Sequence, residues 1–108
     1  MPNFEELFSR IISEIKNELN PIQLILYGSR ANGTANLDSD FDFVAVVPEF
    51  DSSQRAETML KLSARLWKEL DVEVQVWVYS QEQFEERKNE FSSVPEIALS
   101  TGVEVNLG

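Results

Sequence analysis

Two short apolar runs, separated by a stretch of small and polar residues, place the strongest constraint on the fold of this chain. Ile22–Tyr27 ends abruptly at a glycine-serine pair, and Phe41–Val47 ends at Pro48. Runs of this length and composition are typical of buried strands. Residues 29–39, which lie between them, are rich in Gly, Asn, Ser, Thr and Ala. That composition predicts a tight turn, a short helix and a loop.

Two longer segments have the periodicity of amphipathic helices. Residues 3–20 carry apolar side chains at intervals of three and four, and the Asn20-Pro21 pair is expected to end this helix. Residues 51–70 repeat the pattern after a polar start that can cap the helix. The apolar stripe of this second helix leads us to expect Leu66, Trp67 and Leu70 in the core.

The C-terminal third predicts a further strand and two short helices. From Asp71 to Tyr79 the residues alternate strictly, with valine at every second position, which predicts a strand. Ser80 is expected to cap a helix over 81–90 through a capping box, and a short helix over 94–100 and an edge strand over 103–105 follow. The element order predicts one domain over 1–108 of the α/β (α+β) class, in which helices flank a mixed sheet of three to four strands.

Composition removes several classes of function. The chain has no histidine and no cysteine, which excludes a Ser-His-Asp triad, thiol nucleophiles and the common zinc sites. Its net charge of -10 argues against a broad nucleic-acid surface, because such surfaces depend on Lys and Arg. No apolar run is long enough to cross a bilayer, and the N-terminus lacks the charge pattern of a signal peptide. We therefore expect a cytoplasmic protein with no membrane contact.

The segment between the first two strands carries the residues best suited to chemistry. Gly28 allows the backbone to approach an anion closely, and Ser29 offers its hydroxyl and amide at the start of a helix, where phosphate is favoured. Asp40 and Asp42 are two residues apart, so both carboxylates point to one side of a strand. Such a pair suits a hard cation, and Mg²⁺ fits better than any soft metal.

Each feature also has a purely structural explanation. A glycine-serine turn is common, and an Asp-x-Asp pair after Ser39 can cap a turn. Their combination favours function, because two carboxylates on the same side of an apolar strand repel each other unless a cation lies between them. Arg30 is either a phosphate contact or an exposed, ion-paired side chain.

The run LYGSRANGTANLDSDFDFV, from Leu26 to Val44, resembles the signature of the minimal nucleotidyltransferases (MNT) in the DNA polymerase beta-like superfamily. The element order and the closing Thr101-Gly102-Val103 are similar as well, so the resemblance covers nearly the whole chain. It implies Mg-dependent transfer of a nucleoside monophosphate from a triphosphate, with ATP expected, to a hydroxyl on a protein or small molecule. By the family pattern, Gly28, Ser29 and Arg30 bind the nucleotide, and the Asp40/Asp42 pair ligates one or two Mg²⁺ ions.

The third acid of the family pattern has no obvious counterpart here. Its expected register falls on Gln75, which can neither carry a negative charge nor act as a base, and the nearest acid on the same face is Glu73. Either Glu73 completes a catalytic and metal-binding set with Asp40 and Asp42, or Glu73 is an exposed strand residue and the site catalyses poorly.

Three functional hypotheses therefore remain open. The first is an active nucleotidyltransferase. The second is a catalytically weak or inactive module that binds a nucleotide and a partner, such as the antitoxin of a HEPN-type toxin pair, since small relatives often accompany a helical HEPN-type partner. The third is an oligomerisation domain, and a homo-oligomer is compatible with all three.

Overall fold

A computed structural model describes residues 4–33 and 40–108. Its elements are α1 (Phe4–Leu19), β1 (Gln23–Tyr27), α2 (Ser29–Asn32), β2 (Phe41–Val47), a 3-10 turn η1 (Ser52–Gln54), α3 (Arg55–Leu70), β3 (Val74–Ser80), α4 (Gln81–Arg87), α5 (Val94–Thr101) and β4 (Val103–Glu104). The helix and strand order predicted from sequence is confirmed. The loop predicted to follow α2 falls on residues 34–39, which lie outside the described residues.

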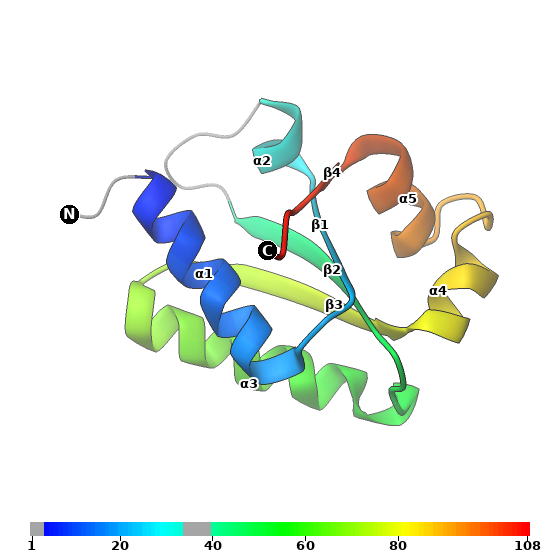
Figure 1. The fold of residues 1–108 in the computed structure, drawn as a ribbon, viewed down its shortest axis with the longest axis horizontal. Coiled ribbons are helices and arrows are strands. Elements are labelled where there is room, and N and C mark those ends of the chain that lie inside the picture. The colour runs from blue at the N-terminus through cyan, green and yellow to red at the C-terminus, as the bar shows by residue number, and fades with distance from the viewer. Residues whose placement is uncertain (1–3, 34–39) are drawn as a thin grey trace.

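The four strands form one mixed sheet in the order β3-β2-β1-β4. β1 pairs antiparallel with β2 and β4, whereas β2 and β3 are parallel. The long helix α3 connects the two parallel strands, as such a crossover requires. The predicted fold class, a mixed sheet of three to four strands with flanking helices, is therefore confirmed (Figure 1).

Helices cover both faces of the sheet (Figure 1). α1 and α3 bury one face, where the main core includes Ile11, Ile15, Phe43, Leu62 and Leu66. α4 and α5 cover part of the other face through Phe84 and Ala98, which pack on Ile25, Val44 and Val46. β2 begins close to α2. The aspartate pair, Asp40 and Asp42, lies at this start of β2, on the second face of the sheet.

Local interactions explain where the C-terminal elements begin. The third strand begins at Val74 and not at Asp71, because Asp71 ends α3 in the left-handed conformation with φ 54°. Ser80 then starts α4 through the predicted capping box, in which its hydroxyl accepts from the Gln83 amide and the Gln83 side chain accepts from the Ser80 amide.

One predicted core residue is wrong. Leu66 is fully buried, but Trp67 is 54% exposed. The neighbouring helix α1 packs on the opposite side of α3, where Arg65 forms ion pairs with Glu14 and Glu18. The indole therefore has no helix to pack against among the described residues.

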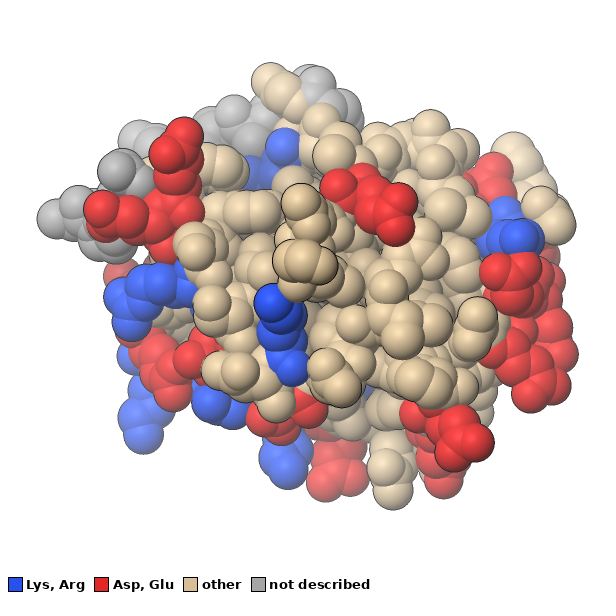
Figure 2. All heavy atoms as spheres, in the orientation of Figure 1, with Lys and Arg blue, Asp and Glu red and all other residues tan. Residues whose placement is uncertain are grey.

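Surface charge follows the acidic composition. On the face shown in Figure 2, acidic side chains gather over α4, and the basic side chains are interspersed with acidic ones. No helix within 4–33 and 40–108 combines the length and apolar character needed to cross a membrane.

Candidate functional site

The site lies where β1 ends and β2 begins. Because these strands are antiparallel, the last residue of β1, Tyr27, pairs with Asp42 near the start of β2. Gly28 follows directly and starts the short helix α2 at Ser29. The two sequence features that predicted a site, twelve residues apart along the chain, are thus brought together by strand pairing alone.

Gly28 and Asp42 are in close contact. The backbone of Gly28 has φ 77° and ψ -156°, a region that is essentially restricted to glycine. A Cβ atom on Gly28 would lie only 3.0 Å from the Asp42 Oδ2 atom. The missing side chain therefore leaves room for the Asp42 carboxylate directly beside the turn where the Ser29 amide and hydroxyl begin α2.

Asp40 and Asp42 lie close enough to interact electrostatically. Partial burial, and then the Asp40 charge, raise the pKa of Asp42 above its ordinary value. The contribution of Asp40 reflects an unfavourable concentration of negative charge at the start of β2. A divalent cation between the two carboxylates would offset this cost, and carboxylates are ligands that Mg²⁺ prefers. The residue types are therefore those that the predicted ion would need.

Glu73 and Gln75 occupy different positions relative to the aspartates. β3 runs parallel to β2 with Gln75 directly opposite Asp42. Glu73 precedes the strand; its carbonyl accepts from the Phe41 amide at 3.0 Å, and its carboxyl forms a hydrogen bond with Asp40. This hydrogen bond, together with the Asp40 charge, raises the pKa of Glu73. The structure thus brings Glu73 to Asp40, while a neutral amide faces Asp42.

Sequence reasoning missed Tyr27 as a neighbour of the site. Burial, then the charge of Asp42, raise the pKa of its hydroxyl well above the ordinary value of 10.0. The phenol therefore stays protonated and can donate a hydrogen bond at neutral pH. Only the β1–β2 register reveals this placement, because Tyr27 belongs to an apolar run that predicted nothing beyond a buried strand.

The remaining predicted residues lie on α2. Ser29 is its first residue and is partly buried. The Arg30 guanidinium lies 4.4 Å from the centroid of the Phe41 ring and 5.8 Å from that of Phe4, on the side of the sheet that α1 covers. The aspartate pair lies on the opposite face of the sheet. To contact a phosphate there, the Arg30 side chain would have to leave the Phe41 and Phe4 rings or extend past the ends of the strands.

With this geometry in place, comparison with known proteins identifies the family. Residues 8–101 match the nucleotidyltransferase domain family. The chain belongs to that family. The assignment confirms the resemblance found in the sequence between Leu26 and Val44 and places the Gly28-Ser29 turn and the aspartate pair within a nucleotidyltransferase domain. No curated protein matches the chain.

Solved structures share the fold of this nucleotidyltransferase domain. A toxin-antitoxin structure with AMP-PNP is 20% identical, with a TM-score of 0.61 over 89% of this chain and 69% of that chain. A complex of tri-AMPylated Shewanella oneidensis HEPN toxin with MNT antitoxin is 17% identical, with a TM-score of 0.55 over 93% of this chain and 69% of that chain. At these identities the likeness establishes the fold.

Within the described ranges, no group of three or more acidic side chains is arranged to hold a single metal ion. The nucleotidyltransferase domain therefore offers two carboxylates, those of Asp40 and Asp42, for the ion that the family pattern implies. An octahedral Mg²⁺ ion is commonly held by one or two protein carboxylates, with water and phosphate oxygens as its other ligands.

Proposed function

We propose that this domain transfers a nucleoside monophosphate from ATP to an acceptor hydroxyl in a Mg-dependent reaction. The observation that carries the proposal is the contact between Gly28 and Asp42. It brings the carboxylate of Asp42, which Asp40 precedes by two residues, beside a backbone turn that can accept phosphate, and a triphosphate with its bound cation requires both kinds of group in one place.

In the proposed reaction the acceptor oxygen attacks the α-phosphorus and forms a new O–P bond. The bond between the α-phosphorus and the bridging oxygen breaks, and pyrophosphate leaves with that oxygen. When bound, Mg²⁺ would supply charge neutralisation for the phosphate oxygens. Gly28 and Ser29 hold the triphosphate, Asp40 and Asp42 hold the ion, and Glu73, within reach of Asp40, accepts the proton of the acceptor hydroxyl.

A second candidate function follows from Gln75. Since a neutral amide stands opposite Asp42, the domain would bind nucleotide and a protein partner while catalysing transfer slowly. Two structural neighbours are toxin-antitoxin assemblies, one with the ATP analogue AMP-PNP and one with an AMPylated HEPN toxin. They support a HEPN-type protein as the partner of this domain under both candidate functions. If the domain is an active transferase, they also support that protein as the acceptor.

Two measurements separate these functions. Calorimetry with AMP-PNP, with and without Mg²⁺, tests the site itself, and incubation with ATP labelled at the α-phosphate, Mg²⁺ and a HEPN-type partner tests transfer. We expect Mg-dependent binding and a labelled partner. Binding without labelling supports the second function, and the absence of Mg-dependent binding contradicts both.

A matched pair of variants ties the result to the aspartates. Asp42→Asn removes one of the two aspartate charges proposed to hold the ion and should abolish Mg-dependent binding. Asp51→Asn makes the same substitution beyond the other end of β2, where the Asp51 side chain accepts from the Ser53 amide at 3.0 Å. Asparagine caps a helix as well as aspartate does, so this control should bind like the unmodified protein.

A further inference from the structure

The Arg30 side chain lies beside two stacked aromatic rings on the face of the sheet that α1 covers. Its guanidinium carbon is 4.4 Å from the centroid of the Phe41 ring and 5.8 Å from that of the Phe4 ring. The two rings are themselves stacked, with their centroids 6.0 Å apart. A cation within about 6 Å of a ring centroid is attracted by the quadrupole of the ring. Arg30 therefore connects α2 to Phe41, the first residue of β2.

Phe41 links this contact to the acidic residues of the site. Its side chain is fully buried in the main core, so the position of the ring is fixed. Its backbone lies between Asp40 and Asp42, and its amide donates to the Glu73 carbonyl at 3.0 Å. Arg30 thus holds α2 against the residue whose backbone carries the aspartate pair.

The contact between Arg30 and Phe41 lies on the opposite face of the sheet from the contact between Gly28 and Asp42. On the second face, the absence of a side chain at Gly28 leaves room for the Asp42 carboxylate. On the first face, Arg30 and Phe41 connect the same two segments again. Together the two contacts hold the glycine-serine turn and the start of β2 together from both faces.

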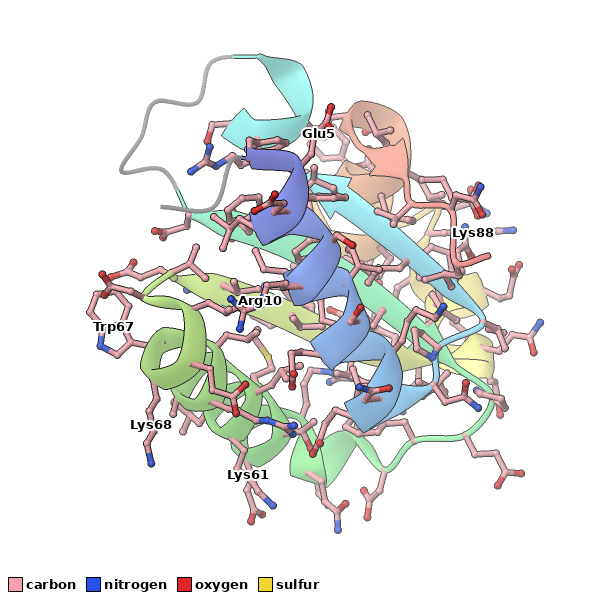
Figure 3. The ribbon with its side chains drawn as sticks, turned by 60° about the vertical axis from the view of Figure 1, so that its left-hand side comes forward. Glu5, Arg10, Lys61, Trp67, Lys68 and Lys88 are labelled. Carbon is pink, nitrogen blue, oxygen red and sulfur yellow. The ribbon has the colours of Figure 1, made fainter. Side chains whose placement is uncertain are left out.

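The short helix α2 depends on contacts of this kind. It has four residues, Ser29–Asn32, follows Gly28, which has no side chain to cap it, and ends at Gly33 in the left-handed conformation. A helix of this length is not stable by itself in water, because too few hydrogen bonds offset the ordering of its backbone. Figure 3 shows the N-terminal end of α1, marked by Glu5, beside α2. Contacts with α1 and β2 therefore fix where α2 lies.

We propose that Arg30 is a positioning residue for the nucleotide and its cation, and that it acts through Phe41 without touching phosphate. The inference rests on the proposed function, in which the glycine-serine turn binds the triphosphate and the aspartate pair binds Mg²⁺. A triphosphate with its bound Mg²⁺ contacts both segments at once, so its affinity depends on the separation between them. Arg30 keeps the two segments at the separation that this ligand requires.

The effect of Mg²⁺ on nucleotide binding separates this role from two others. Loss of a positioning residue weakens only a ligand that bridges both segments, because a smaller fraction of the protein then has them aligned. AMP-PNP without Mg²⁺ needs the turn alone and should bind almost as before. Loss of a direct phosphate contact would weaken binding with and without Mg²⁺. Loss of a residue that only stabilises the fold would change neither affinity.

Calorimetry measures the Mg²⁺ enhancement, defined as the affinity for AMP-PNP with Mg²⁺ divided by the affinity without it. Arg30→Met keeps an apolar side chain and removes the guanidinium, and it should reduce the enhancement by about threefold to tenfold. Arg10→Met removes the same charge from an exposed position farther along α1 and away from α2 (Figure 3), and it should leave the enhancement unchanged. If Arg30→Met weakens binding equally in both conditions, or in neither, the proposal is wrong.

Two phenylalanines of β2 provide a matched pair of variants. Phe41→Leu and Phe43→Leu each remove a fully buried ring from the main core, so both should lower the stability of the fold. Phe41→Leu alone should reduce the Mg²⁺ enhancement. Adding Arg30→Met to Phe41→Leu should have little further effect, because the ring through which Arg30 acts is already absent. Additive losses, or an equal loss in Phe43→Leu, would contradict the proposal.

Hydrogen exchange without nucleotide tests whether Arg30 holds α2. The Ala31 amide donates to the Gly28 carbonyl at 3.1 Å and therefore reports on the opening of this helix. Arg30→Met should speed its exchange by about threefold to tenfold, whereas Arg10→Met should not. Unchanged exchange in Arg30→Met overturns the positioning role even where Mg-dependent binding is found. If the exchange responds but the unmodified chain shows no Mg-dependent binding, the proposed function is wrong and the positioning role is lost with it.

Discussion

The Cα atom of Gly28 lies against the carboxylate of Asp42, so a Cβ atom at that position would stand 3.0 Å from Oδ2. We predict that Gly28→Ala destabilises the fold by about 1–3 kcal/mol, because alanine must adopt a glycine-only backbone conformation. The variant should also lose Mg-dependent AMP-PNP binding, since the new methyl group displaces Asp42. Urea unfolding and calorimetry measure the two effects.

Gly33 provides the control for this prediction. It has a similar positive φ of 80°, but a Cβ atom there would meet no atom of residues 4–33 and 40–108 within 4 Å. Gly33→Ala should therefore lower stability through the backbone alone and leave nucleotide binding intact. Equal loss of binding in both variants would show that the contact with Asp42 is not what matters.

The raised pKa of Asp42 predicts that the site costs stability. An acid whose pKa is raised by folding holds its proton more tightly in the folded chain, so its ionisation destabilises the fold as pH rises through the raised value. At neutral pH, Asp42→Asn should therefore raise the melting temperature by a few degrees. The difference should vanish below the ordinary value of 3.8, where both states are protonated.

Asp51 supplies a control of opposite sign. Hydrogen bonds from Ser53 lower the pKa of Asp51, so its ionisation favours folding and Asp51→Asn should not raise the melting temperature at neutral pH. Melting curves over a pH series, recorded without divalent cations, distinguish the two aspartates. A similar gain from both variants would indicate a general effect of net charge.

The sequence was sufficient to predict the order of the helices and strands and to expect the turn at Gly28 and the aspartate pair in one region, because these depend on local periodicity and a short connection. The sequence did not predict which side of a helix packs against its neighbour, or which residues of adjacent strands lie opposite each other. Trp67 has an apolar side chain at a core-like spacing, but α1 packs on the other side of α3, where Arg65 pairs with Glu14, and the periodicity of α3 does not show which side its neighbour takes. Tyr27 beside Asp42 depends on a strand register that periodicity leaves open.

Arg55 joins the edge of β3 to two helices. Its guanidinium donates to the Val78 carbonyl at 2.7 Å and to Gln83 Oε1 at 2.9 Å, and it lies 4.3 Å from the centroid of the Tyr79 ring. Arg55→Met should therefore reduce the free energy of unfolding by about 1–3 kcal/mol. Urea unfolding measures the change, and Arg10→Met, at an exposed position of α1, should have a much smaller effect. Equal losses would refute this role.

Glu73 is predicted to matter through its contact with Asp40. If it accepts the proton of the acceptor hydroxyl, Glu73→Gln should slow transfer by about a hundredfold or more and leave AMP-PNP binding largely unchanged. Glu86→Gln removes the same charge from an exposed position on α4 and should transfer at the unmodified rate. A Glu73→Gln variant that transfers normally would make Glu73 an ordinary exposed residue before β3.

Gln75 offers a test in the opposite direction. Because it lies directly opposite Asp42 in the parallel pairing, Gln75→Glu should place a third carboxylate beside the aspartate pair and raise the rate of transfer by about tenfold or more. The added charge should also lower stability without Mg²⁺, since three carboxylates then repel one another, and Mg²⁺ should restore it. Gln81→Glu on α4 adds the same charge away from the site and serves as the control. If Gln75→Glu gains neither activity nor Mg-dependent stability, the position opposite Asp42 is not where a third acid acts, and Glu73 carries that role or none does.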